Sequence, residues 1–185
     1  MNEHKILISG PVGAGKTTAV RALSSKQAVS TDVNATEFNS VRKNKTTVAM
    51  DYGVFHAGGE RMHLYGTPGQ ERFQFMWEIL GKNACGLILL IDNSRDNPLQ
   101  DMKHYLKLFH PFSNDHKVAI GVTCMDLAPP SAPTIKDYKD QLLRQCFSFP
   151  VCAVDARKGD DVLNVVFELI DSIKAQSFDK EAMCF

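Results

Sequence analysis

Residues 10–17 read Gly-Pro-Val-Gly-Ala-Gly-Lys-Thr and fit the pattern G-x-x-x-x-G-K-[ST] at every fixed position. The apolar segment before them, residues 5–8, predicts a short strand, and residues 18–23 after them predict a helix. A glycine loop between a strand and a helix lets several backbone N–H groups face one anion, and the helix N-terminus adds partial positive charge. The sequence therefore predicts a loop that wraps a chain of phosphates.

The loop and the first helical turn supply the predicted contacts to a phosphorylated ligand. Lys16 is expected to reach the β- and γ-phosphates of a nucleotide, and the hydroxyl of Thr17 is expected to bind Mg²⁺. Residues assigned to the nucleotide in this segment are Gly10, Val12, Gly13, Ala14, Gly15, Lys16, Thr17 and Thr18.

Length and charge restrict the organisation and the partners of the chain. Its 185 residues suit a single domain, which we expect to occupy residues 1–175, with a flexible tail over residues 176–185. Lys and Arg total 21, as do Asp and Glu, so no net field draws the chain to nucleic acid or to an anionic membrane. The cysteines, five in number, have no metal-site spacing, and we expect reduced thiols in the cytoplasm.

Neither a membrane span nor a lipid anchor is expected. The longest apolar run, residues 85–91, is too short to cross a bilayer. Asn2 stands where myristoylation needs glycine, and Ala182 stands where a prenylation box needs cysteine. The sequence therefore predicts a cytoplasmic protein with no direct membrane anchor.

Apolar runs alternate with stretches of helical periodicity along the chain. The run 86–91 shows no polar alternation, which is typical of a strand buried on both faces of a parallel sheet. Gly58-Gly59 joins two of the predicted strands as a hairpin. Helices are predicted from Pro98 with Asn97 as N-cap, over residues 135–147, and after a cap at Asp160 or Asp161. We expect a three-layer α/β fold of the P-loop type, with a mostly parallel six-stranded sheet, one antiparallel edge hairpin and helices on both faces.

A second motif follows the strand that is predicted to end at Tyr65. Residues 66–73 read Gly-Thr-Pro-Gly-Gln-Glu-Arg-Phe. This stretch resembles the second-switch motif D-T-[AP]-G-Q-E of the Ras-like small GTPases, except that Gly66 replaces the aspartate. The form G-T-P-G-Q, with Val12 in the first loop, looks like the prokaryotic branch of that family that includes the bacterial polarity GTPase MglA. The resemblance extends over residues 6–173.

The resemblance implies roles for residues near the γ-phosphate. The Gly69 N–H would donate to it, and Gln70 would orient the attacking water. Thr47 would bind Mg²⁺ and the γ-phosphate; we prefer it to Thr46 because the family places this threonine just before an apolar residue. Arg42 is a candidate catalytic arginine, with a group from another protein as the alternative.

The base-reading motifs of the family are only partly kept. Thr123-Cys124-Met125-Asp126 stands where the family has N-K-x-D, so Asp126 alone survives to accept from guanine N1–H and the 2-amino group. Adenine presents an acceptor at N1, and an unpaired carboxylate against it is costly. Thr123 replaces only part of the asparagine, and the Ala156 N–H would meet guanine O6. The resemblance therefore implies GTP and GDP, with Mg²⁺, as ligands.

Two departures from the family pattern bear on the chemistry. Gly66 removes a carboxylate that helps to hold Mg²⁺, which predicts a weaker dependence on magnesium. Val12 crowds the space beside the γ-phosphate, which predicts slow hydrolysis.

Taken together, the motifs predict a GTPase that switches between GTP and GDP forms. A module that binds nucleotide without hydrolysing it is the alternative, while a small-molecule phosphotransferase is disfavoured because the arginines are few and scattered. The apolar bulk of residues 73–80 predicts an effector surface at the switch regions. The resemblance further implies a roadblock-fold protein as activator or co-regulator.

Overall fold

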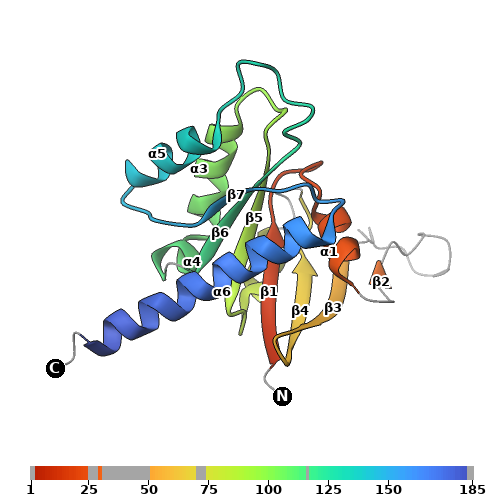
Figure 1. Cartoon of the computed structure of the whole chain (residues 1–185), viewed down its shortest axis with the longest axis vertical. Helices are drawn as coiled ribbons and strands as arrows, with labels where there is room; N and C mark the ends of the chain where they lie inside the picture. The colour runs from red at the N-terminus through yellow and green to blue at the C-terminus, as the bar shows by residue number, and fades with distance from the viewer. Residues whose placement is uncertain (1–2, 25–28, 31–50, 70–73, 116, 183–185) are drawn as a thin grey trace, which may run out of the picture.

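The computed structural model describes residues 3–24, 29–30, 51–69, 74–115 and 117–182 (Figure 1). Its strands are β1 (Glu3–Ser9), β2 (Val29–Ser30), β3 (Asp51–Ala57), β4 (Glu60–Gly66), β5 (Gly86–Asp92), β6 (Val118–Thr123) and β7 (Val151–Ala153). Its helices are α1 (Lys16–Leu23), α2 (Gln74–Gly81), α3 (Pro98–Leu108), α4 (His110–Asn114), α5 (Ile135–Leu143) and α6 (Gly159–Ala182).

The strands form one sheet in the order β2-β3-β4-β1-β5-β6-β7. Strands β4, β1, β5, β6 and β7 pair in parallel, whereas β3 pairs with β4 antiparallel across the turn at Gly58 and Gly59. The predicted fold class is confirmed, and the predicted strands correspond to β1 and β3–β7. A further strand that the sequence did not predict, β2, extends the antiparallel edge beside β3.

Helices cover both faces of the sheet, and each face has its own apolar core (Figure 1). On one face α1 and α6 pack on the strands through residues such as Val20 and Leu169. On the other face α2, α3 and α5 contribute Trp77, Tyr105 and Tyr138. Strand β5 is buried from Gly86 to Ile91 because it contributes side chains to both cores, which explains its unbroken apolar run.

Two helix boundaries illustrate where local signals work and where they mislead. Helix α3 begins at Pro98 after Asn97, as the sequence predicts. Helix α5 ends at Leu143 rather than at residue 147, because Cys146 adopts a φ of 61° that no helix can continue. The N–H of Phe147 instead bonds the carbonyl of Leu142 at 3.0 Å, in the manner of a Schellman cap that usually requires glycine.

Helix α6 begins at Gly159, with the predicted cap residues Asp160 and Asp161 inside its first turn. Carboxylates in a first turn stabilise the helix by interacting with its N-terminal dipole. The helix continues to Ala182, past residue 175, and its C-terminal end extends away from the sheet (Figure 1). The flexibility that the sequence predicts for residues 176–185 stays a prediction.

Candidate functional site

The candidate site lies at the edge of the sheet where β1, β4, β5 and β6 have their carboxyl ends. The loop after β1 carries residues 10–15 and leads directly into α1 at Lys16. Gly10 has a φ of +140°, and a Cβ there would lie 2.0 Å from the carbonyl oxygen of Leu90. Only glycine therefore lets the loop pass this close to β5, and the loop's path over the strand ends depends on it.

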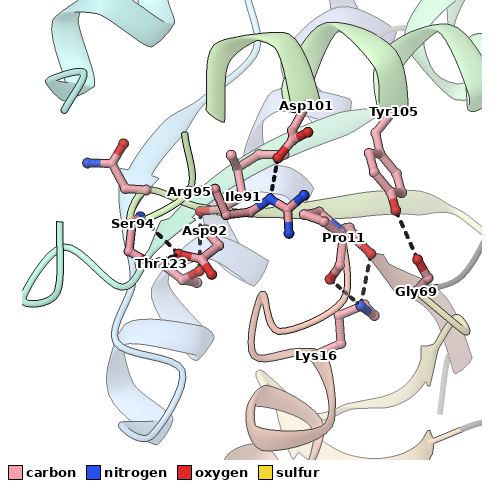
Figure 2. A network of polar contacts seen from close by, with 12 residues as sticks. Pro11, Lys16, Gly69, Ile91, Asp92, Ser94, Arg95, Asp101, Tyr105 and Thr123 are labelled. Carbon is pink, nitrogen blue, oxygen red and sulfur yellow. Dashed lines mark hydrogen bonds and ion pairs between the residues drawn. The ribbon is translucent and has the colours of Figure 1, made fainter. Parts of the chain in front are cut away.

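Lys16 is the buried cation of this loop, with only 8% of its surface exposed. Its Nζ donates to the carbonyl oxygens of Gly10 at 2.8 Å and Pro11 at 2.7 Å (Figure 2). These bonds leave a further N–H of the ammonium group for a phosphate oxygen. Burial lowers the pKa of Lys16 from 10.5 to about 8, and the negative charge of Asp51 opposes this shift.

The lowered pKa predicts that phosphate binding at Lys16 depends on pH. The ammonium form of Lys16 binds an anion, so affinity is highest below the pKa of about 8 in the free protein. Above it, binding must take up a proton, and the dissociation constant of GTP is expected to rise by about tenfold per pH unit until the pKa of the complex is reached. Isothermal titration in buffers of different ionisation enthalpy measures that proton directly. An affinity that stays flat across pH 8, with no proton uptake, contradicts this assignment.

Gly69 stands against the front of the loop. A Cβ on Gly69 would lie 2.7 Å from Lys16 Nζ and 3.0 Å from the backbone nitrogen of Val12. Two aromatic side chains hold this segment. Tyr105 donates its hydroxyl to the Gly69 carbonyl at 3.2 Å (Figure 2). Trp77 donates Nε1 to the Pro68 carbonyl at 3.1 Å. The start of the predicted second switch is thus fastened to α3 and α2, beside the ammonium group that would hold a γ-phosphate.

A carboxylate that the sequence did not predict to be part of the site lies between the start of α1 and the end of β4. Asp51, the first residue of β3, accepts a hydrogen bond at Oδ2 from the hydroxyl of Thr17. It pairs in register with Gly66, and a Cβ on Gly66 would lie 3.2 Å from that same Oδ2 and 3.0 Å from the Cβ of Asp51. The carboxylate of Asp51 therefore occupies the space that a side chain at position 66 would need.

This placement could have been found from the sequence. A two-residue turn fixes the register of a hairpin, so Ala57 opposite Glu60 leads, strand residue by strand residue, to Asp51 opposite Gly66. Directly opposed residues project from the same face of the sheet. The hairpin register therefore predicts that Asp51 lies beside Gly66, the position at which the family has its aspartate.

The oxygen atoms of Thr17 and Asp51 suit a magnesium ion. Mg²⁺ prefers hard oxygen ligands and is commonly held by one or two protein groups together with phosphates and water. Groups of three or more His, Cys, Asp or Glu side chains arranged for a metal do not occur among the described residues, as is normal for an ion that the substrate helps to hold. The donor set of this chain therefore fits magnesium bound with a nucleotide.

A cavity of about 510 Å³ adjoins the loop. The predicted nucleotide contacts Gly13, Gly15, Thr18, Thr123, Asp126 and Ala156 all line it. A Cβ on Gly15 would lie 2.9 Å from the Cβ of Ala156, which shows how closely the loop and the β7–α6 connection approach. Within the loop, Ala14 is fully buried, whereas Val12 is 58% exposed.

Thr123 supports the loop from below. Its side chain is 2% exposed, and its hydroxyl lies 3.2 Å from the Ala14 carbonyl oxygen. The same hydroxyl lies 3.2 Å from the Ile91 carbonyl oxygen (Figure 2). A hydroxyl has one proton to donate, so these carbonyls share it. Thr123 therefore fixes the loop against β5 and β6, and its hydroxyl is directed at the protein backbone.

Charged side chains line the far wall of the cavity. Arg157 Nη2 lies 3.0 Å from Asp126 Oδ2, and the same guanidinium contacts Asp155 through Nε at 2.8 Å and through Nη2 at 3.0 Å. Lys158 approaches Asp155 at 3.8 Å. These contacts hold the pKa of Asp155 down at about 2 and raise that of Arg157. Arg157 was not among the predicted site residues.

Gln70, Arg42 and Thr47 lie outside the described residues, so their predicted roles stay predictions. Within the described part of the chain, no helix combines the length and hydrophobicity needed to cross a bilayer.

Comparison with a solved structure supports the fold. The crystal structure of the G domain of the T. maritima FeoB iron transporter superposes with a TM-score of 0.63. The superposition covers 92% of this chain and 99% of that domain at 19% sequence identity. The chain has the fold of a P-loop GTPase. At this level of identity, the likeness to the G domain concerns the fold alone.

Sequence relatives point in the same direction. The Ras-related protein RABE1d of Arabidopsis thaliana is 25% identical over 177 residues, covering 92% of this chain and 75% of the relative. ADP-ribosylation factor-related protein 1 of Rattus norvegicus is 30% identical over 108 residues, covering 55% and 48%. An uncharacterized protein of Methanocaldococcus jannaschii is 30% identical over 100 residues, covering 54% and 58%. The names of the first two relatives support a Ras-like P-loop GTPase.

The chain spans about half the length of two of these relatives, with 58% and 48% of their sequences matched. No family model matches the chain.

Proposed function

We propose that this P-loop GTPase binds GTP and GDP with Mg²⁺, hydrolyses GTP slowly and acts as a molecular switch in the cytoplasm. The observation that carries the proposal is the contact between the loop and Gly69, which brings the start of the predicted second switch against the Lys16 ammonium group. A terminal phosphate bound at Lys16 would contact the Gly69 backbone. Loss of that phosphate on hydrolysis would remove its contact with Gly69. Such a contact is the kind through which a γ-phosphate orders a switch segment.

In this proposal the chain contributes position and charge rather than a covalent step. Lys16 and the loop N–H groups stabilise charge on the transferred phosphoryl group, while Gln70 orients the attacking water. Magnesium supplies further charge neutralisation at the phosphate oxygens when bound. Thr17 and Thr47 are the proposed magnesium ligands. The carboxylate of Asp51, which lies beside Thr17, helps to hold the magnesium ion in place of the aspartate that the family has at the position of Gly66.

A slow rate is proposed because Val12 is exposed in the loop, with its nitrogen beside Gly69. A branched side chain there narrows the space into which a catalytic arginine must enter. That arginine is Arg42 or a group from an activator, and it contributes roughly 10³–10⁵ in rate in related enzymes. The same observation favours the second candidate, a nucleotide-binding scaffold that does not hydrolyse.

Partner binding is proposed at the switch regions. Ile79 of α2 is 61% exposed, while Trp77 of the same helix is buried and holds Pro68. The helix therefore joins an exposed apolar side chain to a segment that would respond to the nucleotide. A roadblock-fold activator or co-regulator is the proposed partner, in keeping with the resemblance to the MglA branch.

Nucleotide binding and hydrolysis test the proposal in sequence. Nucleotide released from the purified protein by denaturation should be GDP or GTP, and titration should favour guanine over adenine nucleotides. Single-turnover hydrolysis of GTP then separates the switch from the scaffold, because the scaffold holds GTP without releasing phosphate. A chain that binds neither guanine nucleotide contradicts both functions.

A further inference from the structure

The two loops that form the base-binding wall of the cavity are joined by a single guanidinium group. Asp126 belongs to the connection between β6 and α5, and Asp155 with Arg157 belongs to the connection between β7 and α6. Arg157 contacts both carboxylates, at 3.0 Å for Asp126 and at 2.8 Å and 3.0 Å for Asp155. We propose that Arg157 is the positioning residue of guanine recognition, holding Asp126 in the orientation that accepts the guanine N–H groups. The inference rests on the proposed function and deepens it.

The need for such a residue follows from the charges of the wall. Ionised carboxylates accept hydrogen bonds and donate none, so Asp126 and Asp155 cannot bond each other and repel across the cavity. A planar guanidinium with donors on several edges can satisfy both at once, whereas an ammonium group acts as a single point charge. The fork that Arg157 makes on Asp155 leaves Nη2 directed at Asp126 as well.

The arginine is itself held by its own loop. Asp155 Oδ1 also accepts the backbone N–H of Arg157 at 3.0 Å, closing a local turn. The backbone N–H of Asp155 donates to Asp161 Oδ2 at 3.0 Å, which ties that turn to the first turn of α6. Because α6 packs on the sheet through the buried Val162, this support reaches the core. Asp126 therefore receives its contact from a preorganised group.

The arrangement leaves Asp126 capable of binding a base. Arg157 occupies one position on Oδ2, while a carboxylate offers about four lone-pair directions in all. Guanine presents two donors toward such a carboxylate, at N1–H and at the 2-amino group, and hypoxanthine presents only N1–H. Adenine presents an acceptor at N1, so an immobilised carboxylate discriminates against it more strongly than a mobile one.

Arg157→Ala and the matched control Lys158→Ala test the proposal. Both side chains are 67% exposed and each carries one positive charge, but among the described residues the Lys158 ammonium group pairs with Asp155 and not with Asp126. Arg157→Ala is expected to weaken GDP binding by about fivefold, the upper limit for an exposed charge pair, and to lower the GDP-to-ADP affinity ratio by a similar factor. Lys158→Ala removes one charge from the same wall without touching Asp126, so it should weaken GDP binding less than Arg157→Ala does and keep the GDP-to-ADP ratio within about twofold of the wild type.

A nucleotide series and a double variant separate positioning from charge. Arg157→Ala should weaken the binding of IDP less than the binding of GDP. The base of IDP presents one N–H group to Asp126, whereas guanine presents two donors. Arg157→Lys should recover only part of the loss, since lysine cannot fork between the carboxylates. In an Asp126→Asn background, Arg157→Ala should have no further effect on the GDP-to-ADP ratio. Circular dichroism melting of each variant establishes that it is folded.

The outcomes distinguish this inference from the proposed function. Equal losses in Arg157→Ala and Lys158→Ala, or an unchanged GDP-to-ADP ratio in Arg157→Ala, overturn the positioning role while leaving guanine binding intact. If the wild-type chain binds no guanine nucleotide, the proposed function fails and the inference falls with it. A selective loss in Arg157→Ala that Asp126→Asn abolishes supports it.

Discussion

Replacement of Lys16 by methionine is expected to reduce GTP hydrolysis by about 10²–10³-fold, the usual effect of removing one preorganised charge-stabilising group. Methionine matches the length of the buried stem but has no donor for a phosphate. The affinity for GTP should fall more than that for GDP, because the Nζ lies beside Gly69, where the terminal phosphate is proposed to sit. Single-turnover phosphate release and titration with each nucleotide measure these effects.

In the protein without nucleotide, the same substitution has two opposing effects on stability. It removes a cation whose pKa burial has already lowered, and it leaves the Gly10 and Pro11 carbonyls without the bonds they receive from Nζ. We therefore expect a change in melting temperature of only a few degrees. Lys107→Met on the exposed side of α3 is the matched control and should affect neither binding nor hydrolysis. If Lys16→Met binds GTP as tightly as the wild type does, and GDP as tightly as the wild type does, Lys16 is not part of the phosphate site.

The fold was predictable because its strongest signals are local. The apolar run of β5, the Gly58-Gly59 turn and the Asn97-Pro98 helix start each specify a conformation through a few neighbouring residues. Strand β2 is two residues long and exists only through pairing with β3, so no periodicity could reveal it. The end of α5 was missed because Cys146 adopts a left-handed conformation for which glycine is the usual signal.

The site divides in the same way. The phosphate loop was predictable because its glycines and Lys16 act through a continuous stretch of backbone. The wall of the adjoining cavity was not predictable, because Arg157 acts through its contact with Asp126, thirty-one positions away in the chain. Asp51 falls between these cases: it is distant from Gly66 in sequence, yet the hairpin register places it there.

Asp51 carries the second large expectation, which concerns magnesium. Judged from Gly66 alone, the chain should depend weakly on the ion, but the carboxylate beside Thr17 predicts an ordinary dependence that rests on Asp51. Asp51→Ala is expected to raise the magnesium concentration for half-maximal hydrolysis by about 10–100-fold, as for other groups that support a metal's ligands. Titration of nucleotide affinity against magnesium gives a second readout that needs no turnover.

Moving the carboxylate across the strand pair is the sharper test. Gly66→Asp alone should fold poorly or bind magnesium no better, because its Cβ would lie 3.0 Å from the Cβ of Asp51 and bring two like charges together. Asp51→Gly combined with Gly66→Asp removes that crowding and returns the carboxylate to the same space from the opposite strand. The double variant should then recover most of the magnesium affinity that Asp51→Ala loses. If Asp51→Ala keeps the wild-type magnesium dependence, the carboxylate serves only to bond Thr17. The double variant could instead bind magnesium as weakly as Asp51→Ala while melting at the wild-type temperature. In that case the ion requires the carboxylate to come from position 51 on β3, and filling the same space from β4 is not enough.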